Sequence, residues 1–77
     1  MTTNDLGPLL DRNGIRPDAY CLTGGLPNEA YTIERIGNRW RTYYSERGNR
    51  TAVREFASEA DACGDLLARL LRTPDAR

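Results

Sequence analysis

The side chains of this chain that could do chemistry are arginines and aromatic residues concentrated in its middle. The arginines alternate with one tryptophan and two tyrosines, and they are Arg35, Arg39, Arg41, Arg47, Arg50 and Arg54. Arginine suits planar, bidentate recognition, and it stacks on aromatic rings better than lysine does. The chemistry that this segment predicts is therefore binding, either of a protein surface or of a nucleic acid.

Catalytic and metal-binding chemistry has little support in the residue types. The chain contains no histidine, which removes the commonest general base and the commonest metal ligand. Serine, threonine and cysteine side chains consequently lack the partner that would activate them as nucleophiles. The two cysteines, Cys21 and Cys63, form no CxxC pair with which to begin a zinc site. We expect a protein that is not an enzyme, with no catalytic residues, metal or cofactor.

Composition and charge bound the class of protein. Eleven basic and eleven acidic residues give a formal net charge of zero, and every basic residue is an arginine. The apolar fraction of 39% is typical of a folded chain. A length of 77 residues leaves room for one small domain, residues 1–77.

Location is predicted from what the chain lacks. No apolar run approaches the roughly 18–20 residues of a membrane span, and the first residues do not resemble a secretory signal. The default expectation is a cytoplasmic protein that does not enter a membrane. In that compartment the two cysteines are expected to be small buried side chains rather than a disulfide.

The elements that must position the arginines begin with a hairpin. Residues 30–36 alternate in the manner of a strand, and Gly37-Asn38 forms a two-residue turn that fits strand twist. The resulting register gives the sheet a core face that carries Tyr31, Ile33, Trp40 and Tyr44. The opposite face carries Tyr43 and the pair Glu34 and Arg41, whose opposite charges suit solvent. A second turn is expected around Gly48-Asn49.

That second turn leaves two registers of the third strand open. A three-residue loop places Phe56 beside Trp40, on the core face. The same loop places Ala52 beside Tyr44. A two-residue loop places Val53 there instead, because a one-residue shift turns every side chain of a strand over. We favour the three-residue loop, because it buries Phe56 and leaves Val53 on the outer face.

Helices are predicted at both ends of the chain. The first runs from about Asp5 to Asn13 and docks through its leucines. Residues 19–22 have the pattern of a short strand, which a glycine-rich loop joins to the hairpin. The last helix is capped by Ser58 and ends at Thr73-Pro74, after which the chain is expected to fray. The predicted fold is α+β: a short N-terminal helix, a three- or four-stranded antiparallel meander, and a C-terminal helix packed on one sheet face.

One resemblance covers roughly half of the chain. The segments Arg39-Trp40-Arg41 and Phe56-Ala57-Ser58-Glu59-Ala60-Asp61-Ala62 resemble the aromatic strand and the capped, alanine-rich helix of one class of DNA-binding domain. This class is the three-strand-plus-helix domain at the N-terminus of phage-type integrases. The resemblance implies a sheet that reads DNA.

Residues spread along the whole chain carry a second resemblance. They include Leu9-Leu10, Gly14-Ile15, Pro17-Asp18-Ala19-Tyr20, Gly24-Gly25, Glu29-Ala30-Tyr31, Tyr43-Tyr44-Ser45-Glu46-Arg47-Gly48 and Glu59-Ala60-Asp61-Ala62-Cys63. In these the chain is similar to small actinobacterial proteins from the setting of polymorphic toxin systems, which are often taken to be immunity or accessory modules. The resemblance implies a non-catalytic protein that binds one protein partner and blocks it.

Together these patterns favour a protein-interaction module that binds through its sheet face. The predicted binding residues are Glu34, Arg39, Arg41, Tyr43, Arg47, Val53 and Arg54. Tyrosine and arginine dominate binding energy at protein interfaces, whereas nucleic-acid binding domains usually carry an excess of positive charge. A sheet-reading DNA-binding domain is the alternative, and an exposed edge strand would also allow a homodimer. Alanine at Tyr43 or Arg41 is expected to weaken binding and to leave the melting temperature nearly unchanged.

Overall fold

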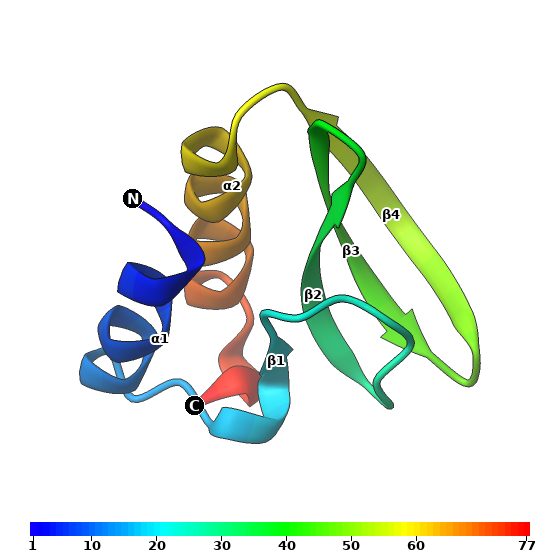
Figure 1. Cartoon of the computed structure of the whole chain (residues 1–77). Coiled ribbons are helices and arrows are strands. Elements are labelled where there is room, and N and C mark those ends of the chain that lie inside the picture. Colours follow the sequence, from blue (N-terminus) through cyan, green and yellow to red (C-terminus); the bar gives the residue numbers. More distant parts are fainter.

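The computed structural model describes all 77 residues and has the predicted α+β class. Along the chain the elements are α1 (Thr3–Arg12), the 3₁₀ turn η1 (Pro17–Ala19), β1 (Tyr20–Cys21), β2 (Ala30–Ile36), β3 (Arg39–Glu46), β4 (Asn49–Phe56), α2 (Glu59–Leu71) and the 3₁₀ turn η2 (Pro74–Ala76). Figure 1 shows α2 along one side of the sheet, with α1 beside α2 and away from β4. We call the sheet side that α2 covers the helix face and the opposite side the outer face.

The sheet has four strands in the order β1-β2-β3-β4 and is mixed rather than wholly antiparallel. β2, β3 and β4 form the predicted antiparallel meander, but β1 pairs parallel with β2 through Tyr20 and Tyr31. A parallel pair needs a connection that returns the chain to its starting end. The glycine-rich segment 22–29 supplies that return, so the prediction of a purely antiparallel sheet is wrong at its first strand.

The first hairpin has the predicted turn and register. Gly37-Asn38 joins β2 to β3, and Glu34 lies opposite Arg41. Of the two turn residues only Gly37 has a positive φ, 60°, which suits a turn with glycine at its first central position. Local turn chemistry is therefore sufficient to align these two strands.

The second hairpin differs from the prediction. Its turn is the two-residue pair Arg47-Gly48, with φ of 51° and 77°, and not a three-residue loop. Positive φ at both central residues is typical of the type I′ turn that fits the twist of a hairpin. In this register Thr51, and not Ala52, lies opposite Tyr44.

A β-bulge in β4 shifts its pairing with β3, so that the end of β4 takes the predicted register. Two residues, Ala52 and Val53, together lie opposite Tyr43, so the register shifts by one residue. Beyond the bulge Phe56 lies opposite Trp40, as predicted. The bulge therefore allows a tight turn at one end of β4 and burial of Phe56 against the core at the other.

The bulge leads to a prediction for Ala52, whose φ of 52° lies in the left-handed region. A Cβ atom in that region costs roughly 1–2 kcal/mol, and glycine avoids most of the cost. We expect Ala52→Gly to raise the free energy of unfolding by about 0.5–1 kcal/mol in urea denaturation. Ala57→Gly, at an exposed site with an ordinary φ, is the control and should not stabilise. A less stable Ala52→Gly protein would contradict this account.

The two ends of α2 differ in how well the sequence predicted them. The predicted Ser58 cap of α2 is confirmed, since its Oγ accepts a hydrogen bond of 3.1 Å from the Asp61 N–H. The C-terminal residues do not fray as predicted. They form η2, where Ala76 is buried and its carbonyl accepts a hydrogen bond of 2.7 Å from the Arg16 N–H.

The core lies between α1, α2 and the helix face. Its fully buried side chains include Leu6, Leu10, Ile33, Ala62, Cys63, Leu66 and Leu70. Half-buried Tyr31, Trp40 and Phe56 pack against them, which confirms the predicted core positions of Tyr31, Ile33 and Trp40. Tyr44 is not part of this core and instead lines a pocket. Both cysteines are free; Cys63 is buried as expected, whereas Cys21 is only partly buried. Neither α1 nor α2 has the length and apolar composition required to cross a membrane.

Candidate binding surface

The strand β4 forms the free edge of the sheet and is the most exposed element. Seven of its eight residues are exposed, and only Phe56 is partly buried. In Figure 1 this strand lies on the side of the sheet farthest from α1. The outward N–H and C=O groups of an edge strand have no partner within the sheet, so they can pair with another chain.

The predicted binding residues do not share one surface. Val53 on the bulge is 46% exposed, and Arg47 is exposed in the turn. Arg39 is half exposed on the outer face, where it forms an ion pair of 3.5 Å with Glu55. Arg54 points to the other side, since it donates to Asp65 of α2. The prediction that all these residues form one binding face is therefore wrong for Arg54.

The outer face of β2 and β3 is covered by the segment 22–29, which crosses it in Figure 1. The Gly25 N–H donates to Glu34 Oε2 at 2.8 Å, and the Tyr43 hydroxyl donates to the Gly25 carbonyl at 2.6 Å. Glu34 Oε1 accepts hydrogen bonds from the Arg41 guanidinium. A Cβ atom on Gly24, whose φ is 75°, would lie 2.6 Å from Glu34 Oε2, so any other residue would be strained there and would displace the Glu34 carboxylate.

This covering loop overturns the expected exposure of Tyr43. The Tyr43 side chain lies on the outer face, as predicted, but it is 0% exposed. The guanidinium groups of Arg41 and Arg50 lie 5.4 and 5.2 Å from the centre of its ring. The loop was expected to be a plain connection. The signal that could have revealed its role is Gly24-Gly25, where positive φ and the lack of a side chain permit close approach.

The ionisation of Glu34 reflects the same cluster. Partial burial acts to raise the pKa of Glu34, but the Gly25 N–H and the Arg41 guanidinium together outweigh it and lower the pKa. A carboxylate held in this way contributes stability above its unfolded pKa. That contribution is lost as the pH falls through the lowered folded value.

A second polar cluster joins α2 to the helix face, and it was not predicted from the sequence. Its centre is Arg69, a charged residue of α2 that is buried, with 7% exposure. Its guanidinium donates to Thr42 Oγ1 at 3.2 Å and to the Ala52 carbonyl of the bulge. Asp65 accepts from the Thr42 hydroxyl at 2.6 Å and from Arg54 at 2.7 Å, and it lies 3.8 Å from Arg69. Burial lowers the pKa of Arg69, and Asp65 opposes that shift.

Groups that could act on a substrate are held in structural contacts. The Thr42 hydroxyl donates to Asp65, and Cys63 is fully buried. Burial first, and then the nearby Glu59, raise the pKa of the Cys63 thiol, which disfavours the reactive thiolate. No three histidine, cysteine or acidic side chains are grouped in a way that could hold a metal ion.

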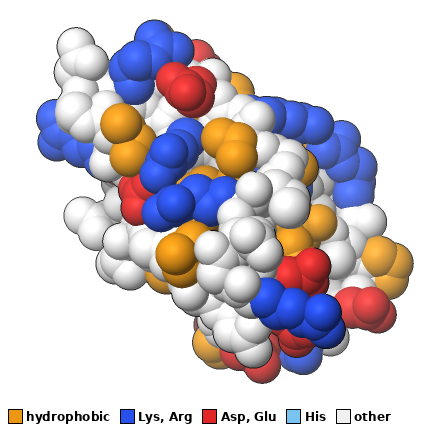
Figure 2. All heavy atoms as spheres, turned by 90° about the vertical axis from the view of Figure 1, so that its right-hand side faces the viewer, with side chains coloured by type: hydrophobic (Ala, Val, Ile, Leu, Met, Phe, Trp, Pro, Cys, Tyr) orange, Lys and Arg blue, Asp and Glu red, His pale blue; other side chains and the backbone are white.

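The arginines of the meander are largely engaged within the protein. Arg39 pairs with Glu55, Arg41 with Glu34, and Arg54 with Asp65. Arg35 donates to the Gly37 carbonyl at 2.9 Å. Figure 2 views the molecule from the β4 side, and its arginine side chains are interspersed with acidic and apolar ones. The surface is mixed in charge rather than uniformly basic.

Comparison with known proteins yields no match. No protein-family model, no curated protein and no solved structure matches the chain. The resemblances to immunity-type proteins and to integrase DNA-binding domains remain predictions from the sequence. The geometry of β4 and its neighbours is therefore the main guide to function.

Proposed function

We propose that this protein is a non-enzymatic, cytoplasmic interaction module that binds one protein partner along β4. The observation that carries the proposal is the exposure of seven of the eight residues of this free edge. An extended segment of a partner can add a strand to such an edge, with main-chain hydrogen bonds supplying affinity. The specific form suggested by the sequence is an immunity-type inhibitor that blocks its partner.

The side chains around β4 support a protein partner. Val53 offers an apolar contact, with Arg50 and Glu55 on the same outer face of the strand. Charges of both signs beside an apolar contact favour a partner with a complementary pattern, and they set register and specificity more than raw affinity. The turn residue Arg47 extends the same edge.

DNA binding is the second candidate, and the ion pairs of the meander weaken it. Phosphate recognition depends on arginines that are free to replace counterions. Three of the meander arginines, Arg39, Arg41 and Arg54, are each paired with a carboxylate of the same chain. Duplex binding that is tight at low salt and falls steeply with added salt would reverse this preference.

The test of the proposed function uses purified protein and the purified products of neighbouring genes as candidate partners. We expect Val53→Lys to weaken binding of the true partner by about tenfold or more, because a charge on an edge strand opposes pairing. Binding is measured by isothermal titration calorimetry, and the melting temperature should remain nearly unchanged.

The control is Arg12→Ala on α1, an exposed arginine away from β4, which should bind like the unmodified protein. A partner that binds Val53→Lys and Arg12→Ala equally well would place the interface elsewhere. Turnover of a substrate by the purified protein would contradict the non-enzymatic assignment.

A further inference from the structure

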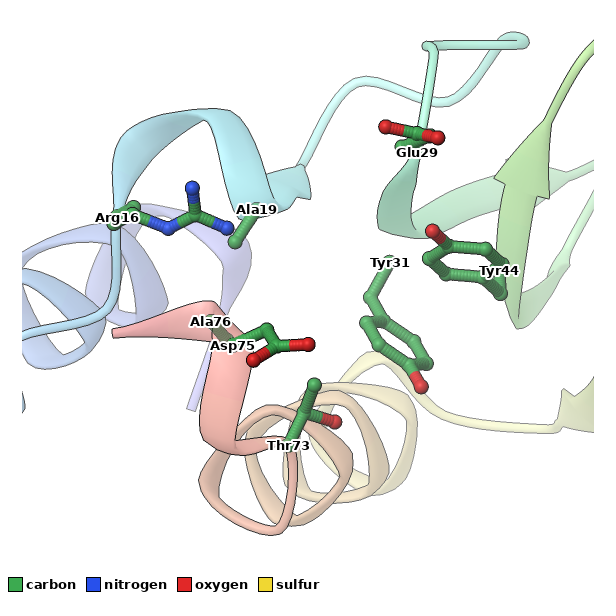
Figure 3. A pocket seen from close by; sticks show the side chains of 8 residues that line it. All are labelled: Arg16, Ala19, Glu29, Tyr31, Tyr44, Thr73, Asp75 and Ala76. Carbon is green, nitrogen blue, oxygen red and sulfur yellow. The ribbon is translucent and has the colours of Figure 1, made fainter.

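A pocket of about 180 Å³ opens on the helix face, away from the free edge of β4. Figure 3 shows η1 and η2 on one side of the pocket. The start of β2 and the end of β3 lie on the other side. The residues that matter for its chemistry are Arg16, Glu29, Tyr31, Tyr44 and Asp75. None of them belongs to the proposed partner-binding strand, so the pocket is a separate candidate site.

One wall of the pocket is aromatic. Tyr31 of β2 and Tyr44 of β3 lie opposite each other, with ring centres 4.9 Å apart and ring planes tilted by 56°. The face of an aromatic ring attracts cations through its quadrupole. Tyr31 already contacts one cation, because the buried Arg69 guanidinium lies 5.8 Å from its ring centre. The Tyr44 ring has no such partner within the chain.

The pocket also carries uncommitted negative charge. In Figure 3 the Asp75 carboxylate points into the pocket, and Glu29 lines it near Tyr44. Neither carboxylate takes part in an ion pair. Burial, then the charge of Glu46 and then that of Glu29, raise the pKa of Tyr44.

Arg16 is the one basic residue on the rim. Its guanidinium lies 3.8 Å from Asp18, and its side chain is 52% exposed. A paired and solvated arginine opposes an incoming cation only weakly, since solvent and its own partner screen its charge. Its removal should therefore strengthen cation binding only modestly.

We propose that this pocket binds a single cationic group, an ammonium or guanidinium on an alkyl chain. Aromatic faces next to free carboxylates are the surroundings in which such cations are recognised. The volume of the pocket limits the size of the ligand. A dry cavity of about 150 Å³ holds benzene, whereas drug-sized ligands occupy pockets of roughly 300–1,000 Å³. The ligand is thus a small free amine or guanidine, or one arginine or lysine side chain of another protein.

The test is a titration followed by two-dimensional NMR at low salt. We expect N-acetyl-arginine-amide to cause saturable shifts at Tyr31 and Tyr44, with a Kd of about 1 mM. N-acetyl-citrulline-amide, the neutral analogue of the same shape, should cause none. Equal shifts with both compounds, or shifts that do not saturate, would overturn the proposal.

Two variants should change the affinity in opposite directions. Glu29→Gln is expected to weaken binding by about two- to fivefold, and Arg16→Ala to strengthen it by a similar factor, as for exposed charge pairs. Variants that change affinity in the same direction, or leave it unaltered, would exclude an electrostatic site. Val53→Lys should leave the titration unaffected, so failure here is distinguishable from failure of the β4 proposal.

The source of the cation is resolved by two further probes. Tighter binding of acetyl-Gly-Arg-Gly-amide than of ethylguanidinium would assign the pocket to a side chain of a protein partner. Equal binding of both probes would assign it to a free small cation. Binding of neither would overturn the proposal.

Discussion

Replacing Arg69 with alanine is expected to lower the free energy of unfolding by about 3–5 kcal/mol, the cost of breaking a buried ion pair by removing one partner. The Arg69 guanidinium bridges Thr42, the Ala52 carbonyl and Asp65 between α2 and the sheet. Its loss leaves the Ala52 carbonyl without this donor and Asp65 with less compensating charge. Since domains are stable by only about 5–15 kcal/mol, the effect should be evident in urea denaturation.

The matched control is Arg72→Ala, an exposed arginine at the end of the same helix. It should change the free energy of unfolding by about 0.5 kcal/mol or less. If Arg69→Ala fails to fold, Arg69→Met combined with Asp65→Asn provides a second measurement. The double variant should lose less free energy of unfolding than Arg69→Met and Asp65→Asn lose in total when made singly, because the two residues interact. Equal effects of Arg69→Ala and Arg72→Ala would show that the cluster contributes nothing.

Replacing Tyr43 with alanine is expected to lower the free energy of unfolding by about 3–5 kcal/mol, as for other large buried aromatic residues. This result is the opposite of what the sequence predicted for Tyr43, because the loop 22–29 covers the ring completely. Tyr43→Phe removes only the hydrogen bond to the Gly25 carbonyl and should cost about 1 kcal/mol. Amide hydrogen exchange at Gly25 should become faster in Tyr43→Phe as the loop loosens.

The control for the hydroxyl is Tyr44→Phe, since the half-buried Tyr44 hydroxyl lies at the pocket and not under the loop. We expect a change within about 0.5 kcal/mol. A stable Tyr43→Ala protein with unaltered Gly25 exchange would mean that the loop does not rest on the ring, and that Tyr43 is available to a partner after all.

For the candidate site, the sequence predicted the existence of an exposed edge strand better than it predicted the individual residues. Val53 and Arg47 lie on accessible surface, as expected. Glu34 and Arg41, by contrast, are used in an internal cluster that anchors the loop. The mixture of arginine and acidic residues was evident from composition, but which arginines are free depends on the carboxylate each one meets in the folded chain.

Features that depend on short-range interactions could be predicted from the amino-acid sequence alone. The Gly37-Asn38 turn, the Ser58 cap and the apolar stripes of the helices each depend on residues within about one helical turn or one hairpin of each other. These features are sufficient to specify an α+β chain with a helix packed on one side of a meander.

Features that join segments far apart in the chain became evident only in the folded structure. The covering of Tyr43 depends on Gly25, which lies 18 residues away, and the burial of Arg69 depends on Thr42, which lies 27 residues away. The bulge at Ala52 supplies Arg69 with a carbonyl acceptor, so strand irregularity and helix position are fixed together. Pairings at such separations follow from burial and hydrogen-bond satisfaction in the packed chain, and no local pattern specifies them.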